Sequence, residues 1–154
     1  GAGCGRQGQC DYHTGEEGSA LAAPAGGMSR LVLDAGALIA LERGERSMWL
    51  RFNRALVRGT DMVTHAGILG QVWRRPERQV VLARTLPSID VHSLTPELAR
   101  QAGELLAASG TADVLDGALA LLCRAGDLVL TSDPDDLILL VTALGVPEVE
   151  VVRA

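Results

Sequence analysis

The sequence predicts an α/β fold, a three-layer α/β/α sandwich with a central, mainly parallel sheet. Short apolar runs alternate with segments of helical periodicity, a pattern typical of parallel strands joined by helical crossovers. The 154 residues, of which 47% are hydrophobic, suffice for one core of ordinary size, so a single folded domain is expected. Aspartates recur just after the apolar runs, where the carboxyl ends of parallel strands meet in a ligand-binding crevice.

Residues 1–27 differ from the rest of the chain. They hold eight of the 18 glycines and show no apolar periodicity, so we expect a disordered leader or an upstream extension. Met28 is a candidate natural start, and the predicted domain covers residues 28–154.

Elements are expected in alternating order along this domain. Apolar runs bounded by turn residues predict strands at 30–33, 61–64, 89–92, 128–131 and 149–152. Helical periodicity, with glycine, proline or capping residues at the ends, predicts helices at 35–43, 47–58, 66–74, 77–86, 95–108, 111–124 and 134–144. In the second helix the candidate core positions are Trp49, Phe52, Leu56 and Val57.

Composition excludes several classes of protein. All 14 basic residues are arginine, so Schiff-base chemistry and a P-loop, which need lysine, are excluded. Two of the three cysteines lie in the leader, which does not suit a disulfide framework, and no apolar stretch could span a bilayer. A soluble cytoplasmic protein with no membrane partner is therefore expected.

Charge is distributed unevenly along the chain. Residues 28–84 carry 10 arginines against 5 acids, whereas residues 85–154 carry 3 arginines against 11 acids. One half could attract phosphates while the other holds cations. For each arginine between 43 and 58, however, solvation of the outer face of a helix is the simpler interpretation.

Four aspartates are candidate metal ligands. Asp34 and Asp133 each follow a strand and precede a helix, while Asp113 and Asp116 share the predicted first turn and face of another helix. Each could instead serve as an N-cap or as a favourable charge at a helix start. Capping does not explain their conjunction, because carboxylates about 4 Å apart repel by roughly 1 to 4 kcal/mol per pair. A divalent metal would remove that repulsion.

Four blocks of sequence resemble a PIN domain of the VapC toxin type, in the family's order and separations. They are residues 31–41 (LVLDAGALIAL), 71–74 (QVWR), 113–118 (DVLDGA) and 130–137 (LTSDPDDL). The resemblance covers residues 28–154 and implies a Mg²⁺- or Mn²⁺-dependent ribonuclease that is blocked by a small antitoxin and is often a homodimer. The matching acids are Asp34, Asp113 and Asp133, with Asp116 and Thr131 as supporting residues.

One position departs from the family pattern. Gln71 stands where the family usually has a glutamate, and an amide oxygen can meet a metal but has no charge and cannot act as a base. Glu42 is the nearest acid that could compensate, although a solvated surface residue is the simpler interpretation. The alternative function is therefore a catalytically weakened PIN-like domain that binds RNA or a protein partner without cleaving.

Other residues lead to weaker expectations. Arg43, Arg46, Arg74 and Arg75 are candidate contacts to an RNA backbone. His65 is expected to serve at a helix entry, with substrate contact as the other interpretation, and Cys123 is expected in the core.

Two other enzyme classes on similar sheets are disfavoured by residues that the chain lacks. A receiver domain would need a lysine. A haloacid-dehalogenase-like phosphatase would need an aspartate where this chain has Gly36.

Overall fold

The computed structural model describes residues 29–154, so the predicted leader at 1–27 and Met28 lie outside the described residues. Five strands form one sheet in the order β3-β2-β1-β4-β5, and every neighbouring pair is parallel. They are β1 Leu31–Leu33, β2 Met62–His65, β3 Asp90–His92, β4 Leu128–Thr131 and β5 Glu150–Arg153.

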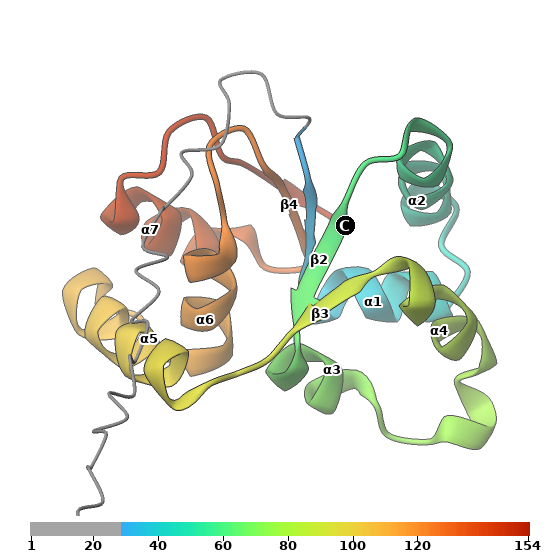
Figure 1. The fold of residues 1–154 in the computed structure, drawn as a ribbon, viewed down its shortest axis with the longest axis horizontal. Helices are drawn as coiled ribbons and strands as arrows, with labels where there is room; N and C mark the ends of the chain where they lie inside the picture. Colours follow the sequence, from blue (N-terminus) through green and yellow to red (C-terminus); the bar gives the residue numbers. More distant parts are fainter. Residues whose placement is uncertain (1–28) are drawn as a thin grey trace, which may run out of the picture.

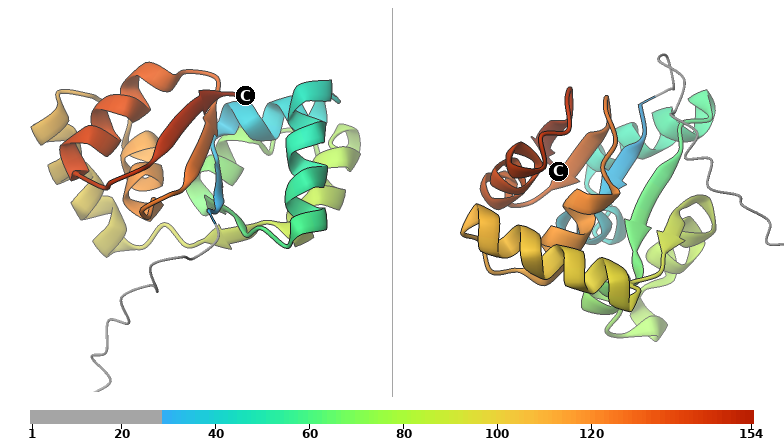
Figure 2. Two further views of the ribbon diagram at one scale, coloured as in Figure 1. Left: turned by 90° about the horizontal axis from the view of Figure 1, so that it is seen from above. Right: turned by 60° about the vertical axis from the view of Figure 1, so that its left-hand side comes forward.

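Helices cover both faces of this sheet. They are α1 Ala35–Glu42, α2 Arg46–Arg58, α3 Ala66–Val72, α4 Val80–Thr85, α5 Pro96–Ser109, α6 Val114–Leu122 and α7 Pro134–Leu144. Figure 1 shows α1 to α4 on one side of the strands and α5 to α7 on the other, and Figure 2 shows the sheet between these two layers. The predicted three-layer α/β/α sandwich is therefore confirmed.

Strand order creates a topological switch between β1 and β4. The chain runs outward from β1 to β2 and β3, then returns to place β4 on the free side of β1 and β5 beyond it. Leu33, the last residue of β1, pairs with Leu130 of β4, so the two strands end side by side. In open parallel sheets, a crevice suited to ligands lies at the carboxyl ends of the strands at such a reversal.

The buried face of α2 differs from the expected one. Met48, Phe52 and Ala55 are buried, whereas Leu56 and Val57 are 45% and 87% exposed, so their assignment to the core was wrong. The buried residues are spaced by four and three positions and share one face of the helix, and the two positions after Ala55 are rotated away from it.

Two predicted helices differ from the structure by three residues at their start. The segment predicted as one helix at 77–86 is a 3₁₀ turn, Pro76–Arg78, followed by α4 and a second 3₁₀ turn, Leu86–Ser88. Helix α6 begins at Val114 rather than at 111, because Gly110 ends α5 in a left-handed conformation (φ 75°) and residues 111–113 form the connection.

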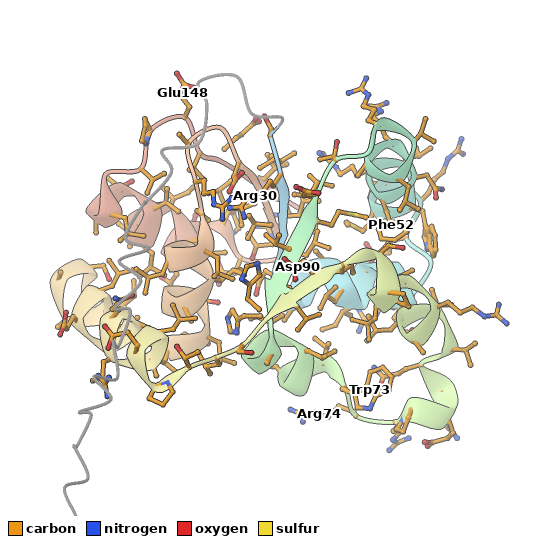
Figure 3. All side chains as sticks on the ribbon, in the orientation of Figure 1. Arg30, Phe52, Trp73, Arg74, Asp90 and Glu148 are labelled. Atoms are coloured by element: carbon orange, nitrogen blue, oxygen red, sulfur yellow. The ribbon has the colours of Figure 1, made fainter. Side chains whose placement is uncertain are left out.

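A buried ion pair ties β1 to the turn before β4 at the amino edge of the sheet. Asp127 accepts hydrogen bonds from Arg30 through the backbone N–H, Nε and Nη2, the last at 2.6 Å, and from the Arg124 backbone N–H at 2.7 Å. The Arg30 side chain lies beside β1 (Figure 3). Both side chains are almost fully buried, so this pair holds the two central strands in register at the end opposite Asp34.

Cys123 is buried against the core, as expected, and burial raises the pKa of its thiol to about 12. Among residues 29–154, no single helix is long and apolar enough to cross a membrane. Helices α5 and α6 together have the length and apolar composition for one, but they are bent by 104° relative to each other.

Candidate active site at the carboxyl edge of the sheet

Asp34 follows β1 directly and is buried. Its Oδ2 accepts a hydrogen bond of 2.6 Å from the hydroxyl of Thr131, which ends β4. The carboxylate makes no capping bond to α1, so the interpretation of Asp34 as a side-chain N-cap is wrong. The carboxylate is therefore held by β4, through Thr131, and not by the first turn of α1.

Asp133 is held by the same hydroxyl through its backbone. Its N–H donates to Thr131 Oγ1 at 3.1 Å, and its side chain does not cap α7. The capping interpretation is therefore wrong here too. Thr131 donates its only hydroxyl hydrogen to Asp34 and accepts from the Asp133 backbone, so it joins the segments that carry the two acids.

Asp113 is a capping residue. Its Oδ1 accepts the backbone N–H groups of Leu115 at 2.8 Å and Asp116 at 3.4 Å. It lies at the N-cap of α6 rather than in the first turn, because the helix begins at the next residue, Val114. Its Oδ2 makes no hydrogen bond to any residue that the structure describes.

Asp116 links these acids electrostatically. The pKa of its carboxyl is raised to about 7, first by burial and then by the charges of Asp34, Asp113, Asp136 and Asp133, in that order. The same five residues, Asp34, Asp113, Asp116, Asp133 and Asp136, are called the carboxylate cluster below.

Asp136 was missing from the candidates drawn from the sequence. It lies three residues after Asp133 in the first turn of α7, a spacing that places two side chains on the same side of a helix. That spacing could have identified it.

Gly36 allows α1 to approach the loop between β4 and α7. A Cβ atom at this position would lie 2.5 Å from Ser132 Oγ and 2.6 Å from the Ser132 backbone nitrogen, closer than atoms can pack. Only glycine therefore fits between these backbones, and the contact brings the start of α1, with Asp34, against the segment that carries Asp133. No local signal in the sequence indicates this role.

His65 joins β2 and α3 to the first turn of α6. Its Nδ1 accepts the Gly67 N–H at 3.1 Å and caps α3, and its Nε2 lies 2.9 Å from the carbonyl oxygen of Leu115. Because Nδ1 accepts, Nε2 carries the hydrogen in a neutral ring, and burial lowers the pKa of this imidazole. The expected helix-entry role is confirmed.

Glu42 forms a hydrogen bond that supports a neighbouring helix. Its Oε2 accepts the Leu82 N–H at 2.6 Å and holds the start of α4, and it is not among the acids that raise the pKa of Asp116. Its interpretation as a solvated surface residue is wrong, since the side chain is half-buried. Gln71 is exposed on α3 and forms no side-chain hydrogen bond within the described range, so its role toward a metal stays a prediction.

The four arginines proposed to contact RNA lie in two exposed pairs. Arg43 and Arg46 flank the turn after α1. This helix begins at Ala35, directly after Asp34, and its eight residues span about 12 Å. Arg74 and Arg75 follow α3, and Arg74 donates through Nη1 to the carbonyl of Gly70 at 3.2 Å (Figure 3). Each pair thus follows the far end of a helix that begins at the carboxyl edge of the sheet, and its role in binding RNA stays a prediction.

A divalent cation suits the chemistry of the carboxylate cluster. Mg²⁺ and Mn²⁺ prefer hard oxygen ligands. The pKa of Asp116 is raised first by burial and then by the charges of neighbouring acids, and a cation would offset that second cause. Within residues 29–154, no three His, Cys, Asp or Glu side chains are already arranged to hold a metal ion. The carboxylates match the chemistry of such a cation, but three of them could coordinate it only after their side chains move.

Comparison with known proteins supports the fold. No protein-family model matches the chain, and no curated protein matches its sequence. A similar chain occurs in the crystal structure of VapBC2 from Rickettsia felis bound to a DNA fragment from their promoter. The TM-score is 0.57 with 10% sequence identity, over 80% of this chain and 98% of that chain. The chain therefore has a PIN-like α/β fold.

Proposed function

We propose that this protein is a metal-dependent endoribonuclease that hydrolyses RNA phosphodiester bonds and acts as the toxin of a toxin–antitoxin pair. The main observation is the carboxylate cluster at the switch between β1 and β4, where burial and neighbouring acids keep the pKa of Asp116 at about 7. The fold shared with a chain of the VapBC2 complex supports the same class of activity.

The residues of the cluster have distinct roles in this proposal. Asp34, Asp113 and Asp133 would hold Mg²⁺ or Mn²⁺, with Asp116 as a further ligand. When bound, such a cation polarises a phosphoryl oxygen and lowers the pKa of bound water. Thr131 orients Asp34 through its 2.6 Å hydrogen bond, and the carboxyl of Asp116 can gain or lose a proton near neutral pH.

Partners follow from the same proposal. Arg43, Arg46, Arg74 and Arg75 would bind the RNA backbone through charge-assisted hydrogen bonds. A small antitoxin would cover the carboxyl edge, and the active form would be a cytoplasmic homodimer.

The second candidate is a binding protein that retains the fold without cleavage. Gln71 favours it, because an exposed neutral amide stands where the family usually supplies a charged ligand. The loss of one carboxylate would weaken metal binding, so a protein of this kind could hold RNA or a partner without hydrolysing it.

Cleavage of a mixed single-stranded RNA pool by the full chain, with Mg²⁺ or Mn²⁺ titrated, tests the proposal. Asp34→Asn is the informative variant, because asparagine keeps an oxygen that can accept from Thr131 while losing the charge. Asp61→Asn is the matched control, since this exposed acid precedes β2 at the opposite edge.

We expect metal-dependent cleavage by the wild type and by Asp61→Asn, and none by Asp34→Asn. Circular dichroism would establish that all three proteins are folded. If the wild type binds RNA but shows no cleavage at any metal concentration, the binding-only function replaces the nuclease.

A further inference from the structure

A second candidate site lies at the amino edge of the sheet. A cavity of about 620 Å³ opens there between the beginnings of β1 and β4 and one face of α2. Its volume falls within the range of small-molecule sites, about 300 to 1,000 Å³. The carboxylate cluster lies at the other end of β1, a strand of three residues and therefore about 10 Å long.

Three arginines of α2 line this cavity. Arg51, Arg54 and Arg58 are three and seven positions apart, so their side chains leave the same face of the helix. In the part of the chain that the structure describes, none of the three forms an ion pair or a side-chain hydrogen bond, and no acidic residue lines the cavity. These three positive charges therefore gather around one space with no neutralising partner among residues 29–154.

The base of the cavity is apolar. Leu31 and Leu128, the first residues of β1 and β4, line it together with Ala55. Arg30 also borders the space, but its guanidinium is already paired with Asp127. The cavity thus combines an apolar surface with three cations from one helix face, of which Arg54 and Arg58 are exposed and Arg51 is half-buried.

We propose that this cavity binds a phosphorylated nucleotide unit, with the phosphate on the arginines of α2 and the base or sugar on the apolar residues. A phosphate monoester carries a charge of about −1.5 to −2 and three acceptor oxygens near neutral pH. A single carboxylate offers one charge and two oxygens, so one phosphate can engage three guanidinium groups where one acidic side chain cannot.

Nucleotide chemistry also suits the rest of the cavity. Guanidinium planes stack on bases as well as binding phosphate, and the leucine and alanine side chains can cover the apolar face of a base or ribose. The site goes beyond the proposed nuclease, because it uses none of the residues of the carboxylate cluster and requires no metal. Its failure would leave the nuclease proposal untouched.

Isothermal titration calorimetry on the full chain tests this site, with EDTA present so that no metal is bound. The probes are adenosine 5′-monophosphate, adenosine, a 5′-phosphorylated oligoadenylate and polyglutamate. The double variant Arg54→Gln/Arg58→Gln keeps much of the aliphatic stems and removes two charges. The matched control is Arg78→Gln/Arg84→Gln, which removes two exposed charges outside the cavity.

We expect the monophosphate to bind more tightly than adenosine, and the cavity variant to weaken binding by roughly tenfold for each guanidinium lost, as for a charged hydrogen bond. The control variant should stay within about twofold of the wild type. Arginine-dependent binding of the monophosphate identifies a free nucleotide as the ligand, and binding of the oligoadenylate alone identifies a nucleotide within a strand.

Three results would overturn the proposal. They are the absence of binding by both phosphorylated probes, equal weakening by the two double variants, and arginine-dependent binding of polyglutamate without binding of nucleotides. Urea unfolding of each variant establishes that it is folded, so a loss of binding reports on the site.

Discussion

Replacing Thr131 with valine removes a single hydroxyl from the centre of the candidate active site and keeps the side-chain volume. In the wild type this hydroxyl donates to Asp34 Oδ2 at 2.6 Å and accepts the Asp133 N–H at 3.1 Å. Thr131 is fully buried, so water cannot replace either bond without rearrangement.

The expected loss of stability follows from these two bonds. Loss of a buried hydrogen bond to an ionised acceptor costs about 1.5 to 3 kcal/mol, and the part-buried Asp133 N–H adds about 1 kcal/mol. The free energy of unfolding should therefore fall by about 2.5 to 4 kcal/mol, a large share of the 5 to 15 kcal/mol typical of a domain.

Thr131→Ser is the control for this prediction. Serine keeps the hydroxyl and loses one methyl group, which costs about 0.8 kcal/mol. Urea unfolding followed by the fluorescence of Trp49 and Trp73 measures both variants. A valine variant as stable as the serine variant would refute the assignment of Thr131 as the residue that joins the two acids.

Three further predictions concern the residues around this site. The pKa of Asp116 is about 7 in the folded protein against 3.8 for the free group, so the folded state binds more protons between these values and loses stability as pH rises through them. The stability of Asp116→Asn relative to wild type should therefore increase from about pH 4.5 to about pH 8. If the urea midpoints of variant and wild type differ by the same amount at both pH values, the raised pKa of Asp116 does not influence stability. Asp127→Ala should lower the free energy of unfolding by about 3 to 5 kcal/mol, because it leaves a buried guanidinium without its carboxylate, and a loss under about 1 kcal/mol would show that the ion pair is not needed. Gly36→Ala should destabilise by about 1 to 3 kcal/mol through overpacking, whereas Gly103→Ala, which meets open space on α5, should be neutral or stabilising in the same thermal unfolding assay.

Helices and strands with strong local signals were predicted well from the sequence. The final helix was predicted at 134–144 and is α7, Pro134–Leu144, because Pro134 starts it and Gly145 ends it in a left-handed conformation. The fourth strand, at 128–131, also agrees with β4. Predictions failed where more than one helix face carries apolar residues. In α2, Leu56 and Val57 were predicted in the core but are exposed.

Only part of the candidate site could be predicted from the sequence. Asp34, Asp113, Asp116 and Asp133 were selected because they lie at strand ends and helix starts, and the charges of the other three raise the pKa of Asp116. The partner of each carboxylate could not be predicted, because capping and cross-strand hydrogen bonding use the same residue type at the same local position. Asp113 caps its helix, whereas Asp34 bonds to Thr131, which is 97 residues away.

The sequence by itself determined the parallel α/β class and the acids after the strands, since both follow from periodicity and order along the chain. Tertiary structure alone decided which groups meet. The approach of Gly36 to Ser132 and the arginine-lined cavity join segments that are distant in sequence, and only packing of the sheet and helices sets those distances.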